Sequence, residues 1–323
     1  MRRIHDLMRC VAILLIGVTS AAVSAQEWPT RPIRMIVPFP AGGTMDVLAR
    51  EIGHHIERTL GQNFIVENKP GAGTVIGVDA AARSTDRHTF VMVANSFTVN
   101  PTLQKSLPYD TLKDLQPVAL VARTANVLAV HPGVPAKTVQ ELVSYAQKNP
   151  TALSYASFGN GTTAHFAAEM LKLRTGIQMV HVPYKGQVPG LNDLIGGRVQ
   201  VMFGNLPEFI PQIEAGKIRA LGTTYLDRTR FTPHIPTVAE QGLPGFETDS
   251  WYGVLAPATT PPAVAEKLNA AINTALDSPE IKQSLTKRHL DPLGGSRQHF
   301  GKFIRSEIDK YAKIVREANI TVD

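Results

Sequence analysis

Three glycine-rich stretches could bind a small anion through the backbone, without help from a lysine or an arginine. They are "PFPAGGTMD" (38–46), "NKPGAGTVIG" (68–77) and "ASFGNGTTAHF" (156–166), and each follows an apolar run typical of a β-strand. Glycine allows conformations that other residues avoid and lets a ligand approach the amides closely. The helix predicted after each stretch would present free N–H groups and the positive end of its dipole. One such turn is common in parallel α/β folds, but three favour a ligand crevice at the carboxyl ends of the strands.

The enzyme signatures in the sequence are incomplete. Residues 159–164 match G-x-G-x-x-A, but the next predicted strand, "VHVPYKG" (180–186), lacks the acidic residue that would hold a ribose. Ser157 lies in "YASFG", which lacks the first glycine of a G-x-S-x-G nucleophile elbow. His54 and His55 have no second histidine or carboxylate at position i+4, so a zinc site is not expected there. The sequence therefore favours a protein that is not an enzyme and that has no cofactor and no metal site.

Four further residues stand at or near predicted strand ends, where they could belong to the same crevice. Tyr184 and Lys185 follow one strand, Asn205 follows the next, and Trp251 lies in "DSWYGVLAP" (249–257). Lys185 is the one cation near a predicted strand end, and a solvated surface lysine is an equally good interpretation. Trp251 is predicted either to line the pocket or to pack in the core.

The order of the predicted elements indicates an α/β fold. Apolar runs predicted to be strands lie at residues 33–39, 63–68, 88–95, 153–158, 178–184, 198–204, 217–224 and 250–257. Helical spacing between most of these runs begins at clear signals, such as the capping box 138–141 and the cap-proline pairs at 260–261 and 278–279. Because strands and helices alternate, we expect mainly parallel sheets covered by helices on both faces.

The first 25 residues have the features of a secretory signal peptide. Arginines precede the apolar run 11–23, and Val23-Ser24-Ala25 offers a small-residue cleavage site. The run is shorter than the roughly 20 residues that cross a bilayer. We therefore expect export to the periplasm with cleavage after Ala25. The single cysteine, Cys10, would leave with this leader, so the mature chain could form no disulfide.

Charge and length restrict the function further. The 33 Lys and Arg and the 27 Asp and Glu are scattered along the sequence, which argues against nucleic-acid binding. A single core is near its practical limit at this length, so two domains are expected. We expect a soluble monomer.

Longer segments, in their order along the chain, resemble one protein family. They include "WPTRPIRMIVPFPAGGTMDVLAR" (28–50), "YASFGNGTTAHFAAEML" (155–171), "DLIGGRVQVMF" (193–203), "PTVAEQGLPGFE" (236–247) and "SWYGVLAPATTP" (250–261). Together they resemble the substrate-binding receptors of tripartite tricarboxylate transporters, the Bug-type periplasmic solute-binding proteins. The resemblance extends over essentially the whole mature chain.

This resemblance implies a two-domain, type II periplasmic-binding-protein fold. Each domain would be a mainly parallel sheet flanked by helices, with the ligand cleft between the domains. Domain 1 would comprise residues 26–124 and 250–323, and domain 2 residues 125–249. Segments near Ala122–Asn126 and Phe246–Tyr252 would act as the hinge.

The resemblance also implies that two loops grip a carboxylate through backbone amides, hydroxyls and ordered water. Asp46 would brace its loop rather than meet the anion. Family members often carry an aspartate where this chain has Gly204, which makes a plain or aromatic carboxylate a better candidate than an amino acid. The candidate ligand-binding residues are Phe39, Pro40, Ala41, Gly42, Gly43, Thr44, Asp46, Asn95, Ser96, Thr98, Ser157, Phe158, Gly159, Asn160, Gly161, Thr162, Thr163, Tyr184, Lys185, Asn205 and Trp251.

The function implied is a receptor that closes on a small carboxylate and delivers it to inner-membrane permease subunits. One alternative is an exported α/β enzyme, such as an esterase or a transferase. Another is a receptor that signals to a membrane sensor, which sequence alone does not distinguish from a transport receptor because the ligand chemistry is the same.

Overall fold

The computed structural model describes residues 27–317 and residue 320, and its large compact unit begins at Arg31. Residues 27–30 belong to a separate unit and contain no helix or strand. The predicted signal peptide, residues 1–25, lies outside the described residues. In the part of the chain that the structure describes, no helix is both long enough and apolar enough to cross a membrane.

The first group of strands is formed mainly by the N-terminal part of the large unit. Strand β1 (Ile33–Val37) pairs in parallel with β2 (Phe64–Asn68) on one side and with β3 (Thr89–Val93) on the other. Strand β9 (Asp249–Pro257) then pairs antiparallel with β3 and with β4 (Leu115–Val130). All five residues of β3 are buried, as expected for a strand covered on both faces.

The second group of strands follows β4. Strands β5 (Ser154–Ser157), β6 (Val180–Pro183) and β7 (Val201–Asn205) are parallel to one another, in the order β7-β5-β6. Strands β7 and β8 (Arg219–Thr223) pair antiparallel with β4, as does the short β10 (Asp291–Pro292). The predicted parallel pairing therefore holds within each group, whereas the pairings of β4 and β9 are antiparallel.

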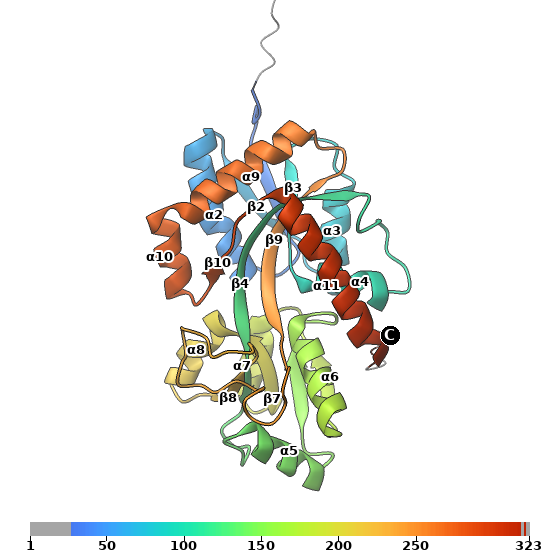
Figure 1. The fold of residues 1–323 in the computed structure, drawn as a ribbon, viewed down its shortest axis with the longest axis vertical. Helices are drawn as coiled ribbons and strands as arrows, with labels where there is room; N and C mark the ends of the chain where they lie inside the picture. Colours follow the sequence, from blue (N-terminus) through green and yellow to red (C-terminus); the bar gives the residue numbers. More distant parts are fainter. Residues whose placement is uncertain (1–26, 318–319, 321–323) are drawn as a thin grey trace, which may run out of the picture. The chain divides into compact units, whose positions relative to one another are not determined.

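Strand β4 joins the two groups, and it was not among the predicted strands. Its residues up to Ala125 pair with β9, and those from Asn126 onwards pair with β7 and β8. Figure 1 shows β4 and β9 running side by side from one group to the other. Its sequence is mainly apolar without a regular strand alternation, and it contains Pro117, which argues against a central strand, so the sequence does not predict one continuous strand. The register of β4 shifts next to this proline, which is where a sheet tolerates one.

Helices connect the strands, and several predicted helix starts are confirmed. Thr138 accepts a hydrogen bond from the amide of Glu141 at the start of α5, and Ser278 accepts one from Ile281 at the start of α10. Helix α2 packs against α9, and α11 packs against α4. The helical segments are α2 (Thr44–Leu60), η1 (Ala72–Thr74), α3 (Val75–Ala82), α4 (Asn95–Leu103), α5 (Val139–Lys148), α6 (Thr163–Thr175), α7 (Gln187–Ile195), α8 (Leu206–Glu214), α9 (Pro262–Asp277), α10 (Pro279–Lys287) and α11 (Arg297–Glu317).

The buried side chains form separate apolar clusters. The largest cluster draws its fully buried members from residues 125–246. A second cluster draws its members from residues 36–120 and 251–304, which are far apart in sequence. Along β4, the second cluster includes Leu120 and the first begins at Ala125, one residue before the strand changes partners at Asn126. A third, smaller cluster joins Phe166 to Val99, Leu103 and Tyr311.

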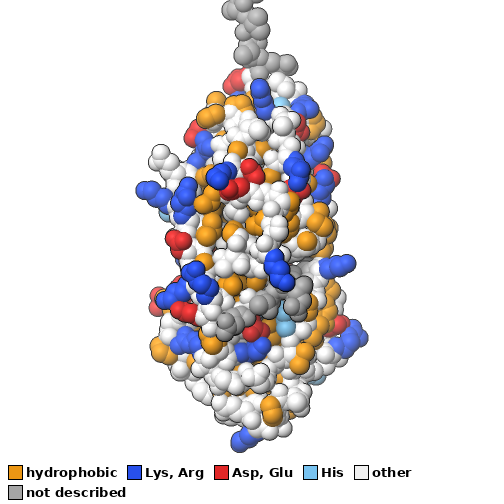
Figure 2. Space-filling model, turned by 90° about the vertical axis from the view of Figure 1, so that its right-hand side faces the viewer, with side chains coloured by type: hydrophobic (Ala, Val, Ile, Leu, Met, Phe, Trp, Pro, Cys, Tyr) orange, Lys and Arg blue, Asp and Glu red, His pale blue; other side chains and the backbone are white. Residues whose placement is uncertain are grey.

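The surface carries charges of both signs. On the face shown in Figure 2, basic and acidic side chains are interspersed. Exposed ion pairs on the molecule include Arg58 with Glu280 at 2.8 Å and Arg228 with Glu240 at 2.9 Å. Exposed pairs of this kind contribute little to stability, about 0–1 kcal/mol each.

Candidate functional site

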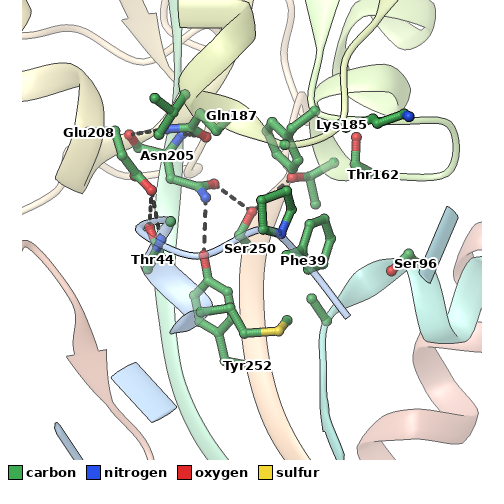
Figure 3. A pocket seen from close by; sticks show the side chains of 18 of the residues that line it. Phe39, Thr44, Ser96, Thr162, Lys185, Gln187, Asn205, Glu208, Ser250 and Tyr252 are labelled. Carbon is green, nitrogen blue, oxygen red and sulfur yellow. Dashed lines mark hydrogen bonds between the residues drawn. The ribbon is translucent and has the colours of Figure 1, made fainter. Parts of the chain in front are cut away.

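A cavity of about 230 Å³ lies where five strands end. The carboxyl ends of β1, β3, β5, β6 and β7 reach its wall, and each strand passes there into the next helix. Ser250 and Tyr252 of β9 complete the lining (Figure 3). Ligands of open α/β sheets bind at such an edge. The volume is below the roughly 300–1,000 Å³ of pockets for drug-sized molecules, so it suits a small ligand.

Five helices begin at this cavity: α2, α4, α6, α7 and α8. In none of them does the side chain of the helix's own N-cap residue accept a hydrogen bond from the first-turn amides. By contrast, α5 and α10 begin elsewhere and are capped by Thr138 and Ser278. Helices α3 and α9 also lack such a cap, so this absence alone does not define a site. The convergence of five helix starts on one cavity does define a site, because each brings N–H groups and the positive end of a helix dipole to one place.

The first glycine-rich loop is held in shape by Asp46, as expected. The carboxylate of Asp46 accepts hydrogen bonds from the amide of Gly42, the side chain of Asn68 and the guanidinium of Arg50. Burial by itself would raise the pKa of Asp46, but these bonds hold it below the ordinary value. Asp46 and Gly42 do not line the cavity, whereas Gly43 does.

A carboxylate that was not predicted lies at the start of α2. Oε1 of Glu208, from α8, accepts hydrogen bonds of 2.8 Å from the amide of Thr44 and 2.6 Å from its Oγ1. Burial raises the pKa of Glu208, against the lowering effect of the bonds from Thr44. An added Cβ at Gly204 would collide with the ring of Phe209, so position 204 faces the core. The acid at this wall therefore comes from Glu208, and the reason given above for disfavouring an amino group is wrong.

Buried polar side chains form one wall of the cavity around Asn205. Its Oδ1 accepts hydrogen bonds of 2.7 Å from Asn126 and from Ser250, and its Nδ2 donates to the hydroxyl of Tyr252 at 3.1 Å. Ser250 is also hydrogen-bonded to Thr163 at 2.8 Å. These side chains come from β4, β7, β9 and α6, so the network fixes the relative positions of four elements at the site.

The second glycine-rich loop contributes only part of its length to the cavity. Phe158, Thr162 and Thr163 line it, while the residues from Gly159 to Gly161 do not. The Oγ1 of Thr162 donates to the carbonyl of Gly159 at 2.6 Å, which closes the loop. Ser157 is fully buried beneath the loop.

Under this loop lies a stack of rings. The ring of His181 stacks between His165 and Tyr155, with centroids 4.3 Å and 4.7 Å apart, and its Nε2 lies 2.7 Å from Oγ of Ser157. Burial lowers the pKa of both histidines to about 4, so both are neutral at physiological pH. A serine paired with a neutral histidine could suggest a nucleophile, but this serine does not reach the cavity.

The predicted residues Asn95, Ser96 and Thr98, which follow β3, are divided between the cavity and the core. Asn95 and Ser96 line the cavity at the start of α4. Asn95 donates to the hydroxyl of Tyr311 at 3.0 Å, and Ser96 is hydrogen-bonded to Thr74 at 3.1 Å. Thr98 is fully buried one turn further along the helix.

Of the remaining candidates, two aromatic residues do not line the cavity and one charged residue does. Trp251 is fully buried, with its Nε1 donating to Glu307 at 3.0 Å, so it belongs to the core and not to the cavity. Tyr184 donates to Asp193 at 2.6 Å, also away from the cavity. Lys185 is exposed and lines the cavity, and in Figure 3 its amine points away from Asn205 and Glu208.

The structure thus brings together part of the predicted set and adds to it. The predicted residues that line the cavity are Phe39, Pro40, Ala41, Gly43, Thr44, Asn95, Ser96, Phe158, Thr162, Thr163, Lys185 and Asn205. Those that do not are Gly42, Asp46, Thr98, Ser157, Gly159, Asn160, Gly161, Tyr184 and Trp251. Lining residues that were not predicted are Met45, Ala94, Gly186, Gln187, Val188, Pro189, Glu208, Ser250 and Tyr252.

Comparison with known proteins identifies the family. Residues 48–320 match the family model described as "Tripartite tricarboxylate transporter family receptor". The chain belongs to this family. BugT of Bordetella pertussis, a related protein, is 36% identical over 319 residues, which cover 97% of this chain and 98% of BugT.

Solved structures of similar proteins agree with this assignment. R. palustris Rpa4515, solved with adipate, is 36% identical with a TM-score of 0.87, covering 91% of this chain and 99% of that chain. MatC from Rhodopseudomonas palustris, solved with bound malate, is 29% identical with a TM-score of 0.84, covering 89% and 100%. The periplasmic binding protein BugD is 31% identical with a TM-score of 0.87, covering 91% and 99%.

Membership of the tripartite tricarboxylate transporter receptor family confirms the predicted resemblance and the α/β periplasmic-binding-protein fold. Receptors of this family bind solutes for transport and are not enzymes, so the alternative of an esterase or a transferase is excluded. The family is one of periplasmic binding proteins.

Proposed function

We propose that this receptor captures a small carboxylate in the cavity and delivers it to the permease subunits of a tripartite tricarboxylate-type transporter. The observation that carries the proposal is the meeting of five helix starts at one cavity, of which that of α2 is capped by Glu208 and the others have no cap from their own N-cap side chains. Two similar receptors, solved with adipate and with malate, support a carboxylate as the ligand class.

The binding groups would be mainly neutral donors. Within the described residues, the amides of Gly43, Ser96 and Thr163 donate no hydrogen bond, and all three residues line the cavity. A helix end contributes about 0.3–1 kcal/mol, and up to about 2 when partly buried. A charge-assisted hydrogen bond contributes roughly 1.5–3 kcal/mol. A few such terms reach micromolar affinity, about −8 kcal/mol, after the cost of ordering the ligand.

Closure on the ligand would be a hinge motion between two domains, residues 26–124 with 250–323 and residues 125–249. Two of the apolar clusters support this division, since the buried members of each lie within one of the proposed domains. A third, smaller cluster bridges the two, because Phe166 of α6 packs there with Val99, Leu103 and Tyr311, and closure would have to preserve or rearrange this contact. The change of partners along β4 supports a hinge near Ala122–Asn126, with its counterpart near Phe246–Tyr252. The wall residues come from both domains, so closure would surround the ligand.

Delivery requires export and a membrane partner. The leader-like residues 1–25 would direct the chain to the periplasm, where cleavage after Ala25 would release it. The permease partner follows from the family, and a membrane sensor would use the same loaded receptor. A pull-down from membranes with ligand-loaded receptor, using empty receptor as the control, distinguishes the two partners.

Isothermal titration calorimetry tests the ligand class. The receptor is first unfolded and refolded to remove any ligand carried through purification, and is then titrated with a panel of mono-, di- and tricarboxylates. We expect at least one acid to bind with an affinity near micromolar, about −8 kcal/mol. If no acid in the panel binds to correctly refolded receptor, the carboxylate proposal is wrong.

A further inference from the structure

The start of α2 is already occupied by a carboxyl group that belongs to the protein, the side chain of Glu208. Both the amide and the hydroxyl of Thr44 donate to Oε1 of Glu208, at 2.8 Å and 2.6 Å. Glu208 lies in the first turn of α8, which the second proposed domain contributes, so this contact also spans the cavity wall. A ligand carboxylate would therefore find the donors of Thr44 taken.

The charge of Glu208 is poorly compensated. Its second oxygen, Oε2, is buried and has no hydrogen-bond partner among the described residues, and the neutral side chain of Gln187 is the nearby group that, after Thr44 and the backbone, lowers the pKa of Glu208. Within the part of the chain that the structure describes, no cation is among the groups that shift the pKa of Glu208, and the amine of Lys185, the cation that lines the cavity, points away from it (Figure 3). A second negative charge brought close to this carboxylate would meet a like charge with no cation between them, which disfavours both charges.

The opposite side of the cavity offers a different environment. In the view of Figure 3, Ser96 and Thr162 lie on the side away from Thr44 and Glu208, with Phe39 between. The starts of α4 and α6 are on that side, and they present uncapped amides without a carboxylate beside them. One end of the cavity is therefore suited to an anion and the other is not.

We infer that Glu208 determines the ligand class: the receptor selects acids with one ionised carboxylate, seated at the starts of α4 and α6, over dicarboxylates whose second carboxylate would reach Thr44. The end of the ligand that faces Glu208 would be neutral or cationic. This inference rests on the proposed function, because it assigns the polarity of the same cavity. It also sets this receptor apart from the two relatives solved with adipate and malate, which are dicarboxylates.

The test compares two straight-chain acids of equal length, one with a carboxylate at one end and one with a carboxylate at both ends. Calorimetry gives the ratio of the two dissociation constants for the wild type, for Glu208→Gln and Glu208→Ser, and for the control Glu214→Gln. Glu214 ends the same helix and is exposed, so its variant makes the same change of charge away from the cavity. The melting temperature of each variant shows that it is folded.

The wild type should bind the monocarboxylate at least about ten-fold more tightly. In both Glu208 variants this preference should fall by about ten-fold or more, while Glu214→Gln should keep it. An unchanged ratio in a folded Glu208 variant, or a wild type that prefers the dicarboxylate, overturns the inference and leaves the proposed function standing. If neither these acids nor any other acid of the panel binds, the proposed function fails and the inference fails with it.

Discussion

The side-chain amide of Asn126 donates a hydrogen bond of 2.7 Å to Oδ1 of Asn205, and this bond ties a connecting strand to the wall of the cavity. Asn126 is fully buried at the residue where β4 changes partners, and Asn205 is the last residue of β7. The same Oδ1 accepts a bond of 2.7 Å from Ser250 of β9. Both connecting strands are thus anchored to one residue that lines the cavity.

Replacing Asn126 by alanine should destabilise the receptor and weaken ligand binding together. The substitution leaves Oδ1 of Asn205 with one partner fewer in a buried position, which costs about 1–3 kcal/mol. Asn205 would also lose the group that orients it towards the cavity. Urea denaturation measures the first effect, and calorimetry measures the second on the folded variant.

The control for this change is Asn149→Ala. Asn149 is exposed after α5, where its side chain donates to the carbonyl of Tyr145 at 2.9 Å. We expect a loss below about 0.5 kcal/mol there, as for most surface substitutions. Equal losses in the two variants would show that the Asn126–Asn205 bond has no special role.

Gly43→Val should abolish ligand binding and leave the melting temperature of the empty receptor within a few degrees of the wild type. Gly43 has an extended backbone, φ −81° and ψ 169°, which any residue adopts, and no atom lies within 4 Å of an added Cβ. The valine side chain would therefore occupy the cavity without straining the fold. Calorimetry should show a loss of roughly a hundred-fold or more in affinity.

The neighbouring glycine provides the matched contrast. Gly42 has φ +88°, and it does not line the cavity. Gly42→Ala should cost about 1–2 kcal/mol of stability, because a side chain is strained in this conformation. A Gly43 variant that unfolds as readily as the Gly42 variant would show that both glycines serve the fold and not the ligand.

Lys185→Gln should reduce ligand affinity by less than about three-fold, which is less than about 1 kcal/mol. The ammonium is exposed and points away from Asn205 and Glu208, so water and salt screen its attraction for the ligand. Calorimetry at low and high salt checks this. A loss above about thirty-fold that disappears in high salt would mean that a cation, and not the neutral donors, captures the acid.

Much of the site could be predicted because it depends on connectivity. The strands before Phe39, Asn95 and Phe158 are parallel to their neighbours within their groups, so their carboxyl ends reach a common edge whatever the details of packing. An apolar run followed by glycines and a helix is visible in a single sequence. The loops that carry these residues were therefore found together.

The residues that were missed depend on side-chain direction and on long-range packing. On β9, Ser250 and Tyr252 face the cavity while Trp251 faces the ring of Phe300 in the core. Successive side chains of a strand point to opposite faces, so an error of one residue reverses the assignment. Glu208 lies 164 residues after Thr44 in the sequence, and only the packing of α8 brings them together.

The buried histidine stack predicts a loss of stability in acid. His165 and His181 are neutral in the folded receptor, because burial lowers their pKa from 6.5 to about 4. The unfolded chain binds protons at these residues as soon as the pH falls below about 6.5, whereas the folded chain does so only near pH 4. The free energy of unfolding should therefore be insensitive to these groups above pH 6.5, fall between about 6.5 and 4, and level off below.

His165→Gln tests this, because glutamine can still accept the hydrogen bond that Nδ1 of His165 accepts from the amide of Gly161. Between pH 6.5 and 4 the variant should lose less stability than the wild type, by up to about 3 kcal/mol, since each unit of pKa shift corresponds to about 1.4 kcal/mol. Urea denaturation at a series of pH values measures the difference. His299→Gln, which removes an exposed imidazole at the start of α11, should keep the wild-type slope. Parallel curves for the wild type and His165→Gln would mean that His165 binds its proton at the same pH in the folded and in the unfolded receptor. The buried histidines under the second loop would then not be the cause of the loss of stability in acid.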